Sequence, residues 1–115
     1  MTGAAGGLSG GLWARLGAEL VPGAAYVLDA IGFDALMRAS AFVVTGEGSL
    51  DEQTLQGKIV GEVATRCRQG GVPCHAIVGR NQLDPFGERI IDLASVTEAT
   101  TLDELRRAGA ALVDG

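Results

Sequence analysis

The stretch from Thr45 to Lys58 constrains this chain more than any other part of the sequence. It reads TGEGSLDEQTLQGK, and it lies between a short apolar run, Ala41 to Val44, and a helical pattern of apolar residues. This order predicts a buried strand, a polar turn over Thr45 to Gln53 and then a helix. In open α/β sheets, ligands bind beyond the carboxyl ends of parallel strands, near the positive end of the next helix. We therefore expect any ligand site in this stretch.

Two helices are predicted before it. Near the N-terminus leucines recur at every fourth position, as in a helix with one buried face, and they are Leu8, Leu12, Leu16 and Leu20. Pro22 and Gly23 end that pattern. A second helix is expected from Ala24, with Gly32 as its C-terminal cap, and Asp34 is expected to cap a short third turn.

A long helix is predicted directly after the polar turn. Its apolar residues fall four positions apart on one face, and they are Leu55, Ile59, Val63 and Cys67. Gly70 and Gly71 stop it. Gly57 and Gly61 lie inside this pattern, where a glycine costs about 1 kcal/mol relative to alanine. That cost indicates a close neighbour, either a packed strand or a ligand.

Two strands and a closing helix are predicted in the second half. The apolar run Cys74 to Val78 is expected to form a buried strand with a loop directly after it, and Ile90 to Val96 a third strand. Gln82 to Arg89 is expected to be irregular, because a proline and a glycine interrupt it. The closing helix begins at Thr101, which forms a capping-box pattern with Glu104.

This order of elements predicts an α/β fold. The expected architecture is a small three-stranded parallel sheet with flanking helices, comparable to half of a Rossmann or flavodoxin-like fold. The 115 residues suit a single domain over 1–115. A parallel sheet needs both faces covered, and the predicted helices cover them only in part. We therefore expect partner structure, either in a homo-oligomer or from a portion of the protein outside this chain.

Charge and composition exclude several kinds of partner. The formal net charge is -5, and the nine Lys and Arg residues form no cluster, so nucleic acid is not expected to bind. No apolar run reaches the ~18 residues that span a bilayer, and no signal-peptide pattern occurs at the start. We expect a cytoplasmic protein without a membrane partner. The two cysteines, Cys67 and Cys74, are expected to be reduced, buried thiols.

The central stretch matches neither common nucleotide-binding loop. A Walker A motif fails because Ile59 follows Lys58 and Glu52 stands where its first glycine belongs. A dinucleotide fingerprint fails because Asp51 stands at the third glycine position. What remains is a turn whose amides could hold an anion, whose Asp51 and Glu47 could bind a hard cation, and whose Lys58 could reach a phosphate. Alternatively, Asp51 only caps the helix and Lys58 is only a solvated helix residue.

Other polar residues are weaker candidates. His75, the only histidine, lies within an apolar run and is expected to be a packed strand residue. Asp84 and Glu88 are expected to face solvent, although their loop could close over a ligand.

Several segments together resemble the C-terminal portion of the glycerate kinase family, which phosphorylates glycerate with ATP. They are GAAGGL at 3–8, VLDAIGFD at 27–34, VTGEGSLDEQTLQGK at 44–58, GGVPCHAIVG at 70–79 and TTLDEL at 100–105. Family members are much longer and have two α/β domains that meet at an active-site cleft. The resemblance implies that this chain is a C-terminal fragment of such a two-domain enzyme.

The resemblance also implies a reaction and its residues. ATP, assisted by Mg²⁺, would transfer its γ-phosphoryl group to a hydroxyl of glycerate. The implied catalytic residues are Glu47, Asp51 and Lys58, and the first two are also the implied metal ligands. The residues implied to bind the cofactor are Gly6, Gly7, Gly46, Gly48 and Thr54. Ser49 and Gln53 are implied to bind substrate, although the family commonly has an arginine at the position of Ser49.

Two functions from different classes remain. The chain is either the catalytic part of a glycerate kinase that depends on the missing portion, or a non-catalytic α/β module that binds an anion or nucleotide weakly. Half of a cleft lacks the effective molarities of ~10⁵ M or more that positioning supplies. We therefore expect the isolated chain to be inactive.

Overall fold

The computed structural model describes residues 15, 17 and 22–114. The predicted helix with the leucine series therefore lies outside the described residues. From Pro22 onwards the order is α2 (Gly23–Ala30), α3 (Phe33–Arg38), β1 (Val43–Leu50), a short 3-10 helix η1 (Glu52–Gln56), α4 (Ile59–Gly70), β2 (Cys74–Asn81), α5 (Pro85–Ile91), β3 (Ser95–Glu98) and α6 (Leu102–Asp114).

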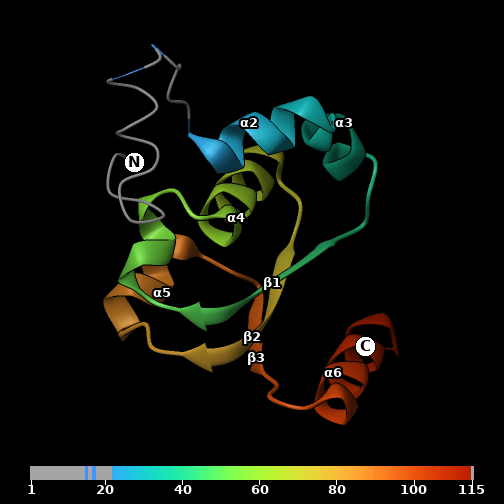
Figure 1. Ribbon diagram of the computed structural model, residues 1–115. Coiled ribbons are helices and arrows are strands. Elements are labelled where there is room, and N and C mark those ends of the chain that lie inside the picture. The colour runs from blue at the N-terminus through green and yellow to red at the C-terminus, as the bar shows by residue number, and fades with distance from the viewer. Residues whose placement is uncertain (1–14, 16, 18–21, 115) are drawn as a thin grey trace.

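The sheet confirms the predicted α/β fold class. Its three strands are parallel and lie in the order β1-β2-β3, so β2 is central (Figure 1). Val43 of β1 pairs with Cys74, and His75 of β2 pairs with Ser95. Because all three strands point the same way, their carboxyl ends meet at one edge of the sheet, where ligands bind in folds of this class.

The first two strands are longer than predicted. The expected polar turn is wrong between Thr45 and Leu50, because β1 continues to Leu50. The loop expected after Val78 is also wrong, because β2 continues to Asn81. Two glycines let the strands approach closely: a Cβ on Gly46 would lie 2.6 Å from the Ile77 carbonyl oxygen, and one on Gly79 would lie 2.6 Å from the Gly48 carbonyl oxygen. The glycines that suggested a loop therefore belong to the sheet.

The long helix predicted after the turn is divided in two. Gly57 has φ 100°, a left-handed conformation that ends η1, and Lys58 is the N-cap of α4. Placing these two residues inside a helix was therefore wrong. Gly61 does lie within α4, and its close neighbour is the Thr54 carbonyl oxygen, which would be 2.1 Å from an added Cβ. The expectation of a close neighbour at Gly61 was correct, but the neighbour is the backbone of η1.

Helix α5 replaces the irregular segment expected around Pro85. Proline is tolerated at the first helical position, because its missing N–H would be unpaired there anyway. The Asp84 side chain caps the helix by accepting a hydrogen bond from the Gly87 N–H at 2.7 Å. Since α5 ends at Ile91, β3 is shorter than predicted and begins at Ser95.

The closing helix α6 agrees with the prediction. The Thr101 hydroxyl oxygen accepts a hydrogen bond from the Glu104 N–H at 3.1 Å. The Glu104 carboxylate in turn accepts one from the Thr100 N–H at 3.4 Å. The cap is therefore present, but the Glu104 carboxylate bonds to the N–H of Thr100 and not, as a capping box predicts, to that of Thr101.

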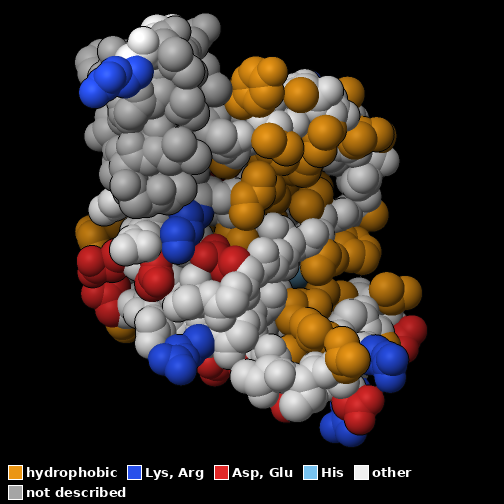
Figure 2. Space-filling view, viewed as in Figure 1, with side chains coloured by type: hydrophobic (Ala, Val, Ile, Leu, Met, Phe, Trp, Pro, Cys, Tyr) orange, Lys and Arg blue, Asp and Glu red, His pale blue; other side chains and the backbone are white. Residues whose placement is uncertain are grey.

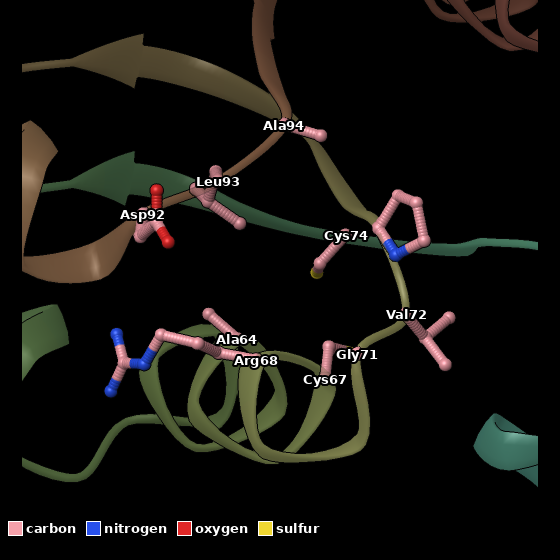
Figure 3. A pocket seen from close by; sticks show the side chains of 10 residues that line it. Ala64, Cys67, Arg68, Gly71, Val72, Cys74, Asp92, Leu93 and Ala94 are labelled. Atoms are coloured by element: carbon pink, nitrogen blue, oxygen red, sulfur yellow. The ribbon is translucent and has the colours of Figure 1, made fainter.

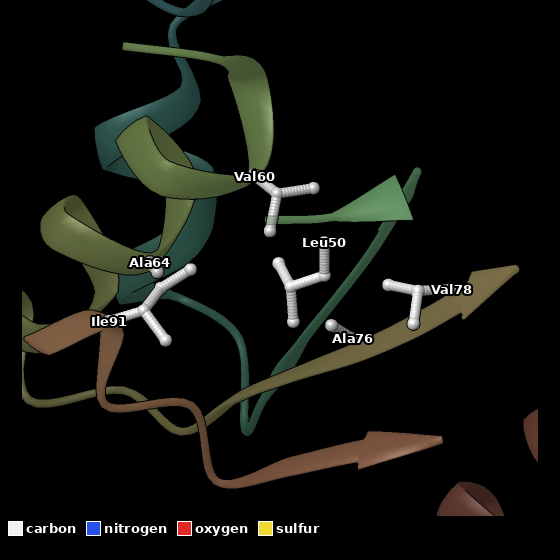
Figure 4. Close-up of a cluster of buried hydrophobic side chains, with 6 residues drawn as sticks. All are labelled: Leu50, Val60, Ala64, Ala76, Val78 and Ile91. Carbon is white, nitrogen blue, oxygen red and sulfur yellow. The ribbon is translucent and has the colours of Figure 1, made fainter. Parts of the chain in front are cut away.

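One face of the sheet carries most of the packed helices. Helix α4 lies between the sheet and α2–α3 (Figure 1). The core on this side has two parts, and Figure 4 shows the first: Leu50, Val60, Ala64, Ala76, Val78 and Ile91. The second consists of Leu28, Met37, Val63, Cys67 and Cys74. Helix α6 contacts β2. A groove between α6 and the sheet is lined by Phe42 and His75.

Arg66 of α4 holds α2 and α3 in place. Its guanidinium lies 2.7 Å from Asp29 and 3.2 Å from Asp34, and its Nε lies 3.0 Å from Glu62. Asp34 therefore pairs with Arg66 instead of capping α3, whose N-cap is Gly32. Gly32, with φ 69°, follows the C-cap of α2, as its predicted capping role requires.

Apolar side chains remain exposed on the outer helices. Figure 2 shows them gathered over α2 and α3, and Tyr26, Val27, Ile31 and Leu36 are each at least half exposed. Association of the chain through such surfaces stays a prediction. Of the helices in the described part of the chain, none has both the length and the apolar character that crossing a bilayer requires.

Candidate functional site

The candidate site forms at the carboxyl ends of β1 and β2. Glu47 and Ser49 lie on the last residues of β1, Asp51 follows directly, and Gln82 follows β2. Glu47, Ser49 and Asp51 are half-buried. Three of the predicted site residues are thus brought to the edge of the sheet where ligands bind in this class of fold.

Asp51 caps η1. Its Oδ1 accepts a hydrogen bond from the Gln53 N–H at 2.9 Å, and its own N–H donates to the Thr54 Oγ1 at 3.2 Å. This reciprocal pair is a capping box, and it confirms the capping interpretation of Asp51. The remaining lone pairs of the carboxylate leave a ligand role possible, so that role stays a prediction.

Thr54 links the Glu47 carboxylate to the Asp51 backbone. Its hydroxyl donates to the Glu47 carboxylate, with oxygen distances of 3.1 and 3.2 Å, while accepting from the Asp51 N–H. The Thr54 side chain is fully buried. It therefore faces neither solvent nor an open surface on which a cofactor could bind.

Ser49 lies between an aspartate and a glutamine. Its Oγ is 3.3 Å from the Asp51 Oδ2 and 3.4 Å from the Gln82 Oε1. Gln82 also continues the backbone pairing, because its N–H donates to the Leu50 carbonyl at 2.7 Å. Arg80, an exposed residue, is the register partner of Ser49. Sequence reasoning assigned no role to Gln82 or Arg80, and their place at the end of the second parallel strand was the signal that could have identified them.

Lys58 lies at the start of the longest helix next to the site. It is exposed, and α4 begins at the following residue. Helix N-termini present unpaired N–H groups and partial positive charge, which favour anions. Lys58 therefore places a positive charge at a helix end whose N–H groups favour anions, and its contact with a phosphate stays a prediction.

The predicted glycine contacts have different outcomes. Gly46 and Gly48 lie within β1, and the close approach of β2 gives Gly46 a packing reason to be glycine. Their contacts with a phosphate stay a prediction. Gly6 and Gly7 lie outside the described residues. Gln53 is exposed, and its backbone N–H is bound to Asp51.

The two carboxylates do not make a complete metal cage. Within residues 22–114, no group of three or more His, Cys, Asp or Glu side chains is arranged to hold a metal ion. Mg²⁺ in phosphoryl-transfer enzymes is commonly bound by one or two carboxylates, waters and the substrate phosphates. Glu47 and Asp51, half-buried and hydrogen-bonded to the protein, fit this pattern and would hold the ion only together with a bound nucleotide.

Polar groups elsewhere serve packing. The His75 Nδ1 lies 2.6 Å from the Ser95 Oγ, and its ring meets Phe42 edge-on with centroids 5.8 Å apart. This arrangement confirms the interpretation of His75 as a packed strand residue. Asp84 caps α5, and Glu88 accepts a hydrogen bond from the Asn81 side chain at 3.2 Å. Both residues are exposed, as predicted.

The two cysteines line a cavity of 330 Å³ away from the candidate site. Figure 3 shows Cys67 from α4 and Cys74 from β2 beside it. Both thiols are buried and free, as predicted. Burial raises the pKa of Cys74 to about 12, with the nearby Cys67 contributing. The cavity lies at the amino ends of β2 and β3, opposite the edge that carries Glu47.

Comparison with known proteins identifies relatives over nearly the whole chain. A model of the glycerate kinase family matches residues 1–113. The glycerate kinase of Halalkalibacterium halodurans is 42% identical over 116 residues, covering 97% of this chain and 30% of that protein. The glycerate 2-kinase of Escherichia coli is 38% identical over 110 residues, covering 91% of this chain and 29% of that protein.

A solved structure agrees with these matches. A crystal structure assigned to glycerate kinase 2 of Salmonella typhimurium LT2 is 35% identical and has a TM-score of 0.55, covering 93% of this chain and 28% of that chain. The chain spans less than a third of the length of the curated relatives that it matches. With the parallel sheet, the family match over residues 1–113 shows that this chain belongs to the glycerate kinase family.

Proposed function

We propose that this chain supplies one wall of an active site that transfers the γ-phosphoryl group of ATP to a hydroxyl of glycerate. The observation that carries the proposal is the pairing of Glu47 and Asp51 through Thr54 at the carboxyl end of β1, in a chain of the glycerate kinase family. Enzymatic phosphoryl transfer needs positioned groups that neutralise charge on the phosphates. Two carboxylates that could hold Mg²⁺, near the N-terminus of α4, suit that requirement.

The carboxylates have the charge and the free lone pairs that this chemistry requires. Mg²⁺, when bound, neutralises charge on the nucleotide phosphates. Glu47 and Asp51 would hold it together with those phosphates, and Asp51 would alternatively orient the attacking glycerate hydroxyl. Both roles need the Asp51 carboxylate in a fixed place, and it accepts hydrogen bonds from the Gln53 N–H and the Ser49 hydroxyl.

Cationic and polar groups around the carboxylates would bind the phosphates and the substrate. Lys58 and the first amides of α4 suit a phosphate, with Gly46 and Gly48 as further amide donors. Ser49 and Gln53 suit the hydroxyls of glycerate. Arg80 pairs with Ser49 in the sheet register. Its guanidinium would therefore supply the positive charge for the glycerate carboxylate, in place of the arginine that the family commonly has at position 49.

The rest of the cleft would come from the portion of the protein outside this chain. The chain matches less than a third of each curated relative, and the family resemblance implies two domains. Positioning both substrates needs two walls. We therefore propose that a cytoplasmic enzyme is assembled only when this chain associates with that portion.

A phosphoryl-transfer assay tests this function. ATP, Mg²⁺ and glycerate are supplied to the chain alone and to a complemented enzyme, in which the chain is joined to the unmatched part of the Halalkalibacterium halodurans glycerate kinase. We expect turnover only in the complemented enzyme, and a loss of at least about 100-fold in Asp51→Ala. Asp103→Ala, on the exposed side of α6, is the matched control and should leave the rate unchanged.

The alternative function makes the opposite prediction. A chain that only binds an anion or nucleotide weakly would give a complemented enzyme without turnover. Turnover that Asp51→Ala leaves intact would remove Asp51 from the mechanism.

A further inference from the structure

Thr54 is the one polar side chain that is buried among the residues that the structure describes. Its relative exposure is 0%, and both partners of its hydroxyl belong to the candidate site. Burying a hydroxyl is unfavourable unless its hydrogen-bonding capacity is used. A buried threonine between two carboxylate residues therefore calls for a reason beyond filling space.

The hydrogen bonds of the Thr54 hydroxyl are all made to the protein. A threonine hydroxyl has a single hydrogen, and here it is shared between the two oxygens of Glu47, at 3.1 and 3.2 Å. The oxygen accepts from the Asp51 N–H at 3.2 Å. The hydroxyl is thus directed at the protein on both sides, and the cofactor contact implied for Thr54 by the family resemblance does not agree with this geometry.

The backbone of Thr54 is held as tightly as its side chain. Its carbonyl oxygen lies against Gly61 of α4, where an added Cβ would be only 2.1 Å away. Its N–H donates to the Asp51 carbonyl at 3.0 Å. Thr54 is therefore fixed to the first turns of α4, and whatever its hydroxyl binds is fixed to α4 as well.

We propose that Thr54 is a positioning residue of the phosphoryl-transfer site. It acts through Glu47 and Asp51, whose relative placement its single hydroxyl sets, and it touches neither nucleotide nor glycerate. This inference rests on the proposed function. It adds a reason why the site is ordered: α4, through Thr54, holds the Glu47 carboxylate and the backbone of Asp51 in place.

The test compares variants that keep or remove the hydroxyl. Thr54→Val preserves the shape, Thr54→Ser preserves the hydroxyl, and Thr65→Val is the matched control, because Thr65 bonds only to the Gly61 carbonyl at 2.9 Å. Binding of Mn²⁺ with ATP to the complemented enzyme is followed by electron paramagnetic resonance. Removing a residue that orients metal-binding groups typically costs 10- to 100-fold in affinity or activity. We expect a loss of about that size in Thr54→Val, near wild-type affinity in Thr54→Ser and no change in Thr65→Val.

A double-mutant cycle separates positioning from general stability. If Thr54 acts through Glu47, then Thr54→Val in a Glu47→Gln background lowers kcat by much less than it does alone. Fully additive losses, or wild-type Mn²⁺ binding and kcat in a folded Thr54→Val, would overturn the inference. If Thr54→Val does not fold, Thr54→Cys replaces it, with a weak thiol donor in place of the hydroxyl, and the same outcomes apply.

The two proposals fail in different ways. A wild-type complemented enzyme with neither turnover nor Mn²⁺-ATP binding overturns the proposed function, and this inference with it. An active wild-type enzyme whose Thr54→Val variant is equally active overturns the inference alone.

Discussion

Single residues at this site are determined by how closely backbones approach each other. An added Cβ on Gly46 or Gly79 would meet a carbonyl oxygen of the neighbouring strand at 2.6 Å, and one on Gly61 would meet Thr54 at 2.1 Å. Sequence alone indicated a close neighbour at Gly61, since glycine is unfavourable inside a helix. It could not say which neighbour, because that depends on how η1 folds back onto α4.

The packing at Gly61 gives the first prediction. Gly61→Ala forces a methyl group against the Thr54 backbone, and we expect it to lower the free energy of unfolding by about 1–3 kcal/mol, measured by urea denaturation. Gly109→Ala is the control: it is also helical but has no atom within 4 Å of the added Cβ. Gly109→Ala should stabilise the chain by up to about 1 kcal/mol. Equal stability of Gly61→Ala and the wild type would contradict the packing.

The buried thiol of Cys74 gives a pH dependence. Burial raises its pKa from 9.0 to about 12, so between these values the native thiol stays protonated while the unfolded one ionises. The native state then binds more protons, and stability falls as pH rises. We expect the Cys74 contribution to be complete below pH 9 and lost towards pH 12. Cys74→Ala, compared by denaturation across this range, should show a shallower fall, and an identical slope would contradict the assignment.

The candidate residues differ in how far sequence could identify them. Asp51 and Glu47 were predicted because carboxylates directly after an apolar run suggest a site at a strand end. Gln82 was not, because its approach to Ser49 depends on the register of β1 against β2. Thr54 was predicted as a ligand contact, and only the structure shows that it is buried and that its hydroxyl bonds to Glu47 and Asp51.

At the scale of elements, the sequence predicted which elements exist better than where they end. Parallel strands over Val43 and Cys74, the helix α4 and the closing helix α6 were all expected and are present. The errors share a cause: glycine and proline were interpreted as breaks. In β1 the pairing with β2 outweighs the low strand propensity of glycine, and in α5 proline occupies the one helical position that suits it.

Docking of α2 and α3 on α4 gives an element-scale prediction. Arg66, with 11% of its side chain exposed, bonds to Asp29, Asp34 and Glu62. Arg66→Met leaves these carboxylates without their common partner, so we expect faster amide hydrogen exchange in α2 and α3 and unchanged protection in the sheet. Arg106→Met removes a pair that is exposed on both sides and is the control. Unchanged exchange in α2 and α3 would show that apolar packing alone holds them.

At the scale of the whole molecule, the chain is an incomplete layered structure. Helices α2, α3 and α4 are stacked on one side of the sheet (Figure 1), while the exposed apolar residues include Val44 of β1 and several on α6. Family members matched by this chain are more than three times its length. Partner structure was predicted from the small size of the sheet, and the exposed apolar residues support that prediction.

Association gives the last prediction. Tyr26, Val27, Ile31 and Leu36 are between 50% and 63% exposed on α2 and α3, and apolar surface of this kind favours association. We expect the isolated chain to form dimers or larger assemblies by light scattering. The double substitution Ile31→Glu and Leu36→Glu should shift it towards monomer, whereas Glu52→Gln, at an exposed position of η1, should not. A wild-type chain that is monomeric at high concentration would contradict this expectation.

The shared hydroxyl of Thr54 also limits how this site can change over generations. One hydrogen serves both oxygens of Glu47, and the same oxygen anchors Asp51. A substitution at position 54 therefore alters the surroundings of Glu47 and Asp51 at once. Among the twenty amino acids, only serine offers a hydroxyl on an equally short side chain, so a descendant that keeps this arrangement has a single replacement open to it.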